Sequence, residues 1–192
     1  MKRLMGAMMA VALLVLCAAG AAGEPLYAAD GSAVSGRIDF TEGLAPYAGK
    51  WVNFQDGFRL YLPQDWERSD VSDAQAQAGL FYRETNNGSD SVVGELNMGV
   101  AVSYAEANGL QTLDDLAASY AAGGLGEVDK LDLNGLPVVT FASRAEDYRG
   151  VAFFHPLVAG YVMTIYVSPC GVGDRLVNDV GSAILCSLTP RA

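Results

Sequence analysis

The sequence predicts an α+β fold in which two helices cover a curved antiparallel β-sheet. Runs of alternating apolar residues recur along the chain, as expected for half-buried strands. Tight-turn signals such as Asn134-Gly135 join neighbouring runs, and strands joined by tight turns pair in the antiparallel sense. Two segments, one opening at Thr112 and one over residues 174–185, have apolar residues at helical spacing. Each such helix must bury its apolar stripe, so both are expected to pack against the sheet.

The first 23 residues have the three parts of a secretory signal peptide. Lys2 and Arg3 give a basic start, residues 4–19 carry no charge, and small residues follow as far as Gly23. The apolar run is shorter than the roughly 20 residues that a membrane-spanning helix needs. Cleavage after Ala21, Ala22 or Gly23 would fit these small residues, and we favour Gly23. We therefore expect a secreted product and no transmembrane segment in the mature chain.

A lipid anchor at Cys17 is the alternative fate of this segment. A bacterial lipoprotein signal has a small residue directly before the lipidated cysteine, and Leu16 departs from that pattern. Soluble export is therefore the main expectation, with a membrane-anchored lipoprotein as the second.

The mature chain is predicted to have a short extension followed by one domain. Residues 24–50 are poor in large apolar side chains and are expected to form an extension with an edge strand near residues 34–40. The domain is expected to cover residues 51–192. Its predicted strands are 51–54, 58–62, 79–84, 92–104, 128–133, 136–143, 148–155 and 161–168, and its predicted helices follow Thr112 and span 174–185.

Local signals predict where the first helix begins and ends. Thr112 and Asp115 have the spacing of a capping box, with Asp in place of the more usual Glu. Gly123 and Gly124 are typical of a helix C-terminus.

Cys170 and Cys186 remain after export, and a disulfide between them is conceivable in a secreted chain. The predicted final helix lies between them, and twelve helical residues span about 18 Å. A disulfide requires Cα atoms within about 7 Å, so we expect no bond unless the helix is shorter or the tail folds back. No cysteine pair has the spacing of a redox or zinc motif.

Charge and composition exclude several functions. The formal net charge is −10, which disfavours binding to nucleic acid and gives no attraction to anionic lipid. His155 is the only histidine, so a site with several histidine ligands is impossible. His155 could act as a general base, but without a companion nucleophile motif we expect a strand-end side chain bonded to backbone groups.

The acidic residues suggest a second class of function. Four close pairs occur along the chain, namely Asp70/Asp73, Asp114/Asp115, Asp129/Asp132 and Glu146/Asp147. Paired carboxylates serve glycoside hydrolases and calcium sites, so a hydrolase or a calcium-dependent carbohydrate binder stays as an alternative. The oxygen-rich stretch 86–90 is better explained as a turn.

Several features together resemble the PsbP/Mog-like family. They are the strand Phe58-x-Leu60-x-Leu62-Pro63, Trp66 shortly after it, the helix at Thr112, the Asn134-Gly135 hairpin and a C-terminal helix. The resemblance covers roughly residues 51–188 and includes no catalytic signature. It implies an α/β/α sandwich and a protein that acts by binding other proteins, as members of that family mostly do.

From the sequence we therefore expect an exported, monomeric, non-enzymatic protein that needs no cofactor. We expect it to bind an unidentified protein or another component of the cell envelope. The outer face of strand 58–62 offers Arg59 and Tyr61 as a candidate binding surface, because both residue types favour interfaces.

Overall fold

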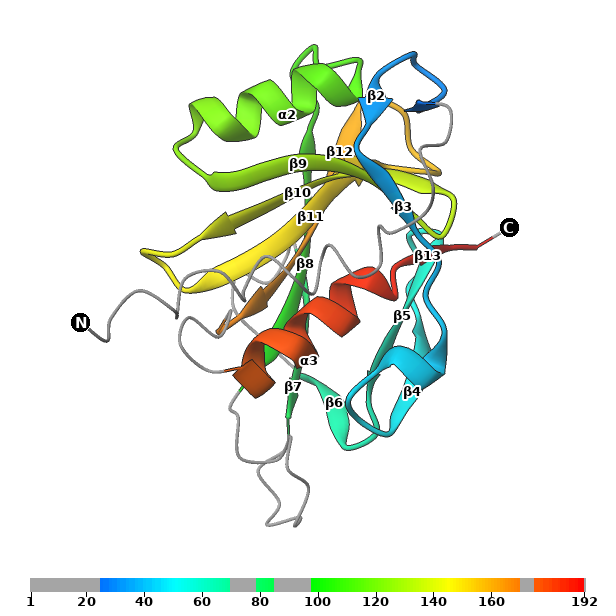
Figure 1. Ribbon diagram of the computed structural model, residues 1–192, viewed down its shortest axis with the longest axis vertical. Coiled ribbons are helices and arrows are strands. Elements are labelled where there is room, and N and C mark those ends of the chain that lie inside the picture. The colour runs from blue at the N-terminus through cyan, green and yellow to red at the C-terminus, as the bar shows by residue number, and fades with distance from the viewer. Residues whose placement is uncertain (1–24, 70–78, 85–97, 170–174, 192) are drawn as a thin grey trace, which may run out of the picture.

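The computed structural model describes residues 25–69, 79–84, 98–169 and 175–191 (Figure 1). The predictions for the export signal, including Cys17 and Gly23, lie outside these ranges. The same holds for the turn at residues 86–90, the beginning of the strand predicted at 92–104, and Cys170.

Within the described ranges, the main sheet has eight strands in the order β3-β9-β10-β11-β12-β8-β7-β6. Their bounds are β3 Gly36–Ile38, β9 Gly126–Leu133, β10 Leu136–Ser143, β11 Tyr148–Phe154, β12 Tyr161–Ser168, β8 Gly99–Glu106, β7 Gly79–Glu84 and β6 Trp66–Ser69. All neighbours are antiparallel except β3, which runs parallel to β9. The prediction of a purely antiparallel sheet is therefore wrong at this edge. That prediction rested on tight turns between neighbouring strands, and no tight turn joins β3 to β9.

A second, smaller sheet corrects the prediction of a single sheet. It has the order β13-β5-β4, with β4 at Gly49–Asn53, β5 at Phe58–Pro63 and β13 at Thr189–Pro190. The hairpin of β4 and β5 was predicted, but its separation from the main sheet was not. β13 lies beyond the final helix, where the sequence predicted no strand.

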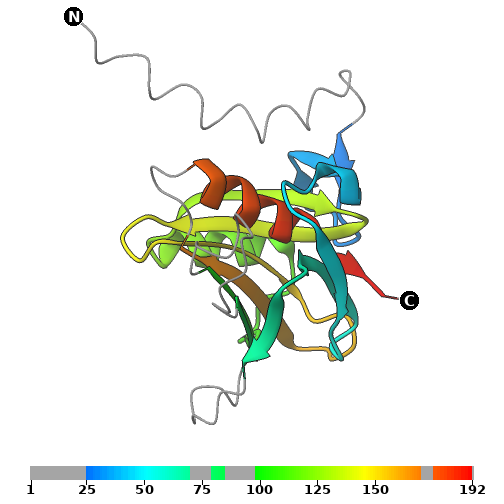
Figure 2. The same ribbon diagram turned by 90° about the horizontal axis from the view of Figure 1, so that it is seen from below.

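The two helices lie on opposite faces of the main sheet (Figures 1 and 2). Helix α3 (Arg175–Cys186) and the small sheet cover one face, where Val180 and Ile184 join a core with Ile165. Helix α2 (Leu113–Ala122) covers the other, where Leu113 and Leu116 pack in a second core. Alternation along the strands supplies both cores.

The local signals of the sequence act as predicted. Thr112 and Asp115 form both hydrogen bonds of a capping box at the start of α2. Asn134 and Gly135 both have positive φ angles, 53° and 88°, as required in the tight turn between β9 and β10. Gly124, with φ of 82°, follows the end of α2.

Residues before β4 also contribute structure. Strands β1 (Leu26–Tyr27) and β2 (Ala33–Val34) form a hairpin, and η1 (Glu42–Leu44) is a short 3-10 helix. β3 lies at the edge of the main sheet and carries Ile38, which is buried in the core beside α3. None of the helices in the described ranges has the length and apolar character needed to cross a membrane.

Candidate functional site

Arg59 and Tyr61 lie on the outer face of β5, as the alternation predicted. Phe58, Leu60 and Leu62 on the inner face are completely buried. However, Tyr61 is only 7% exposed. Tyr61 is therefore a packing residue, which corrects the expectation that its side chain lies on an open binding surface.

The cover over Tyr61 comes from the segment before β4. The ring of Tyr47 stacks on Tyr61 with centroids 5.9 Å apart, and Phe40 packs at 5.8 Å. The Tyr47 hydroxyl donates to the backbone carbonyl of Tyr61 at 2.8 Å, and the amide of Gly49 donates to the Tyr61 hydroxyl at 3.1 Å. Burial raises the pKa of Tyr47 far above its usual value, so it stays a neutral donor.

Arg59 is half-buried and is already engaged with Trp51. Its guanidinium carbon lies 4.2 Å from the centroid of the Trp51 ring, a cation–π arrangement. The indole nitrogen of Trp51 donates to the Glu42 carboxylate at 2.8 Å. One face of Trp51 is therefore covered by Arg59, so this cluster offers no open aromatic platform on that face.

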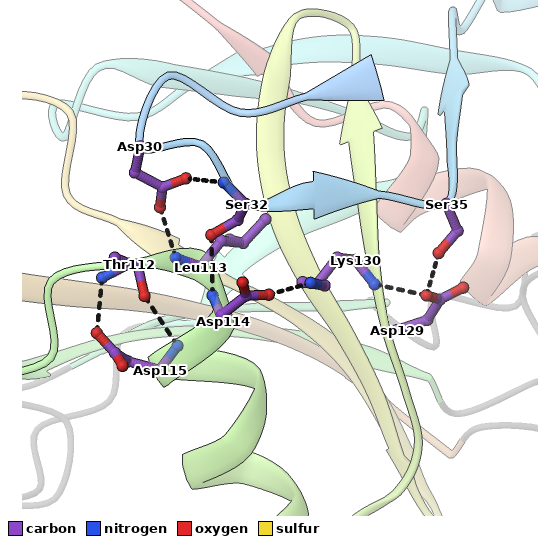
Figure 3. Close-up of polar contacts among 9 residues, drawn as sticks. All are labelled: Asp30, Ser32, Ser35, Thr112, Leu113, Asp114, Asp115, Asp129 and Lys130. Carbon is purple, nitrogen blue, oxygen red and sulfur yellow. Dashed lines mark hydrogen bonds and ion pairs between the residues drawn. The ribbon is translucent and has the colours of Figure 1, made fainter. Parts of the chain in front are cut away.

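Asp30 joins the N-terminal hairpin, residues 25–35, to the beginning of α2 (Figure 3). One carboxylate oxygen accepts from the amide of Leu113 at 2.6 Å, and the other accepts from the amide of Ser32 at 2.8 Å. Burial alone would raise the pKa of Asp30, but these hydrogen bonds outweigh it and the pKa is lowered. The Ser32 hydroxyl accepts from the amide of Asp114 at 3.2 Å.

The neighbouring acids also have structural partners (Figure 3). Asp115 accepts from the amides of Gln111 and Thr112, and these bonds, together with the Thr112 hydroxyl, lower its pKa. Asp114 forms an ion pair with Lys130. Asp30, Asp114 and Asp115 thus place three carboxylates near the N-terminus of α2, where negative charge is favoured.

The next acid pair, on β9, is used in the same way. Asp129 accepts from the hydroxyl of Ser35 and from the amide of Lys130. Asp132 accepts from the amide of Gly135 at 2.8 Å in the tight turn. Among the described residues, no group of three or more His, Cys, Asp or Glu side chains is placed to hold a metal ion.

His155 has backbone partners, in keeping with the structural interpretation of this residue. Its Nδ1 atom accepts from the amides of Leu157 and Val158 at 3.1 and 3.2 Å. Its Nε2 atom lies 3.6 Å from the Asp56 carboxylate. His155 therefore ties the turn between β11 and β12 to the turn between β4 and β5.

The turn between β11 and β12 carries part of an exposed apolar surface, which we name the β12 strip. Its members are Tyr104, Leu157, Val158 and Tyr161. Leu157 is 64% exposed, Tyr104 is 49% exposed and Val158 is 46% exposed. The rings of Tyr104 and Tyr161 meet edge to face with centroids 6.1 Å apart.

Tyr104, Leu157 and Tyr161 lie on one side of the main sheet. Tyr104 pairs with Met163, and Met163 lies two residues from Tyr161 on the same face of β12. A Cβ atom added at Gly57 would lie 3.0 Å from Leu157 Cγ, so Leu157 reaches the small sheet on that side.

Sequence reasoning missed the β12 strip. The one available signal was the pair Leu157-Val158 between the strands predicted at 148–155 and 161–168, where polar residues are the norm. The position of Tyr104 beside Tyr161 depends on the pairing of β8 with β12, which no local signal specifies.

Cys186 is the last residue of α3 and is half-buried. The expectation that Cys186 forms no disulfide with Cys170 stays a prediction, because Cys170 lies outside the described ranges.

No family model matches the chain, and no curated protein matches it. Among solved structures, a cyanobacterial PsbP protein from Synechocystis sp. PCC 6803 is similar at 14% identity and a TM-score of 0.46. That match covers 79% of this chain and 97% of the PsbP chain. A protein from Bacteroides thetaiotaomicron is similar at 10% identity and a TM-score of 0.42, over 75% of this chain and about half, 49%, of that one.

The first of these structures carries the name of the family that the sequence resembles. Both TM-scores lie below 0.5 and both identities are low, so the functional proposal rests on the residues of this chain.

Proposed function

We propose that this chain is exported and that its mature domain acts outside the cytoplasm as a non-catalytic module that binds a protein partner. Export is supported by the basic start, the apolar run and the small residues that end at Gly23. Binding is supported above all by the β12 strip, an exposed apolar surface on ordered strands and a hydrogen-bonded turn. Such surfaces mark protein interaction sites when they are contiguous.

The use of the charged residues supports binding over hydrolysis. Asp30 and Asp115 cap the N-terminus of α2, Asp114 pairs with Lys130, and Asp129 and Asp132 stabilise the strands beside it. Each of these carboxylates therefore has a structural partner. A hydrolase or a calcium site would instead need carboxylates that converge on one point.

The export half of the proposal is tested by the intact mass of the protein recovered outside the cytoplasm of its host. A chain that begins at Glu24 supports cleavage after Gly23. A diacylglycerol-modified chain that begins at Cys17 replaces soluble export with membrane anchoring. A full-length chain found in the cytoplasm refutes export.

The binding half is tested by a photo-activated cross-linking residue placed at three exposed sites in the exported protein. Val158 reports on the β12 strip, Leu44 on the cover of the small sheet, and Ala118 on the outer side of α2. The proposal predicts a discrete protein adduct at one of these surfaces and none at the others. Equal, diffuse labelling at all three sites, or no adduct at any, contradicts it.

A further inference from the structure

We infer that the β12 strip binds a protein segment in which Lys or Arg side chains stand beside apolar ones. This inference rests on the proposed function and adds to it the location of the surface and the chemistry of the partner.

The apolar side chains Leu157 and Val158 lie in the turn between β11 and β12. Leu157 and Val158 are both exposed, yet their amides are held by the ring of His155. The Leu157 side chain also lies beside Gly57 in the turn between β4 and β5, where an added Cβ atom would be 3.0 Å from Leu157 Cγ. The backbone that carries the exposed methyl groups is thus held in place before a partner arrives, which reduces the entropy lost on binding.

The aromatic side chains of the β12 strip lie on β8 and β12. Tyr104 is exposed and Tyr161 is half-buried, and their rings meet at an interplanar angle of 68°. An edge-to-face pair leaves part of one ring face open, and aromatic faces attract Lys and Arg side chains.

Two acids and one cation lie around the β12 strip. Glu106 lies directly opposite Tyr161 in the strand register and is exposed. The Asp56 carboxylate lies at the other side, next to His155, with its side chain 30% exposed. Arg191, a cation near Gly57, donates to the backbone carbonyl of Phe54 at 3.4 Å.

Two other occupants are disfavoured by charge. A second copy of this chain brings the same excess of acids, since the formal net charge is −10. An anionic lipid surface would be repelled for the same reason. A cationic and apolar protein segment is the occupant that fits both the apolar side chains and the acids.

The test uses the exported full chain with the photo-activated residue at Val158, so that Leu157 and the tyrosines stay intact. We expect one protein adduct, and peptide sequencing of its cross-linked segment should find Lys or Arg within a few residues of apolar side chains. The substitution Glu106→Lys should lower the adduct yield by at least about tenfold, because it places like charges together. Glu146→Lys, in the turn at the opposite end of β11, is the matched control and should leave the yield unchanged.

The outcomes separate the two proposals. An adduct at Leu44 or Ala118 but not at Val158 overturns this inference while the binding module stands. An adduct at Val158 with lipid, with a second copy, or with an acidic segment also overturns it. Unchanged yield in Glu106→Lys does the same, and no adduct at any site removes both proposals.

Discussion

The carboxylate of Asp30 accepts a hydrogen bond from the amide of Leu113 at 2.6 Å, although 83 residues separate them in sequence. The first amides of a helix have no partner within the helix and must be satisfied from outside. Thr112 and Asp115 satisfy part of this need locally, and Asp30 adds a partner from the N-terminal hairpin. The hairpin is thereby fixed to the beginning of α2.

Replacing Asp30 with Ala should weaken the fold. The amides of Leu113 and Ser32 lose their acceptor, and loss of a cap of this kind costs about 1–2 kcal/mol in unfolding free energy. Asp30→Asn keeps an acceptor oxygen and should cost less. The control is Asp39→Ala, which removes an exposed ion pair with Arg37 and should stay within about 0.5 kcal/mol. Urea denaturation measures all three, and equal losses at both aspartates would refute the capping role.

Acid should remove the contribution of Asp30. Its folded-state pKa lies below the usual 3.8, so its ionised form stabilises the fold above that pH. This stabilisation is lost as the pH falls through the lowered pKa. The difference in unfolding free energy between the wild type and Asp30→Asn should be constant above about pH 5 and shrink below about pH 4. A difference that grows on acidification would contradict the direction of the pKa shift.

His155 should control the order of the turn that carries the β12 strip. His155→Phe removes the acceptor for the amides of Leu157 and Val158 while keeping an aromatic ring of similar size. We expect hydrogen exchange at these two amides to accelerate by roughly fivefold, since each local hydrogen bond contributes about 1 kcal/mol. Exchange at Leu116, in the core on the other face, should not change. Unaltered exchange in the turn would show that the imidazole does not hold it.

Asn134 should be sensitive for two separable reasons. Its side chain donates to the carbonyls of Cys186 and Leu188 and accepts from the amide of Phe40 at 2.6 Å, while its backbone has a φ of 53°. Asn134→Ala loses the bonds and strains the backbone, at a cost of roughly 2–4 kcal/mol. Asn134→Gly loses only the bonds and should recover about 1 kcal/mol of that. Denaturation midpoints that rank Gly below Ala would exclude backbone strain.

Gly150 should tolerate no side chain. A Cβ atom there would lie 2.6 Å from the carbonyl oxygen of Ile165 and 2.6 Å from the ring of Phe141. Gly150→Ala should cost roughly 1–3 kcal/mol or more through overpacking. Gly43→Ala, where nothing lies within 4 Å of the added Cβ, is the control and should be neutral. Equal thermal stability of the two variants would contradict the close packing of β11 on its neighbours.

Local sequence signals predicted much of the fold. The capping box at Thr112 and the turn at Asn134-Gly135 depend on residues a few positions apart, so a single segment contains the whole cause. Strand β12 was predicted over residues 161–168 for the same reason, since alternation is complete within it.

The errors came from contacts between distant segments. β3 pairs in parallel with β9, and β13 pairs with β5. Both β3 and β13 are short, with three and two residues. Short strands carry too little alternation to be recognised, and their partners are set by the packing of the whole domain. Tyr61 shows the same limit for the candidate site, because alternation gave its face of β5 while Tyr47 and Phe40 decided its burial.

Native and denaturing mass spectrometry of the protein recovered outside the cytoplasm tests the central claim most directly. The denaturing spectrum should show a chain that begins at Glu24, and the native spectrum should show that chain in a complex with one protein partner. Glu106→Lys should shift the native spectrum towards the uncomplexed chain, while Glu146→Lys should not. A full-length chain confined to the cytoplasm, or an exported chain with no protein partner, would contradict the account.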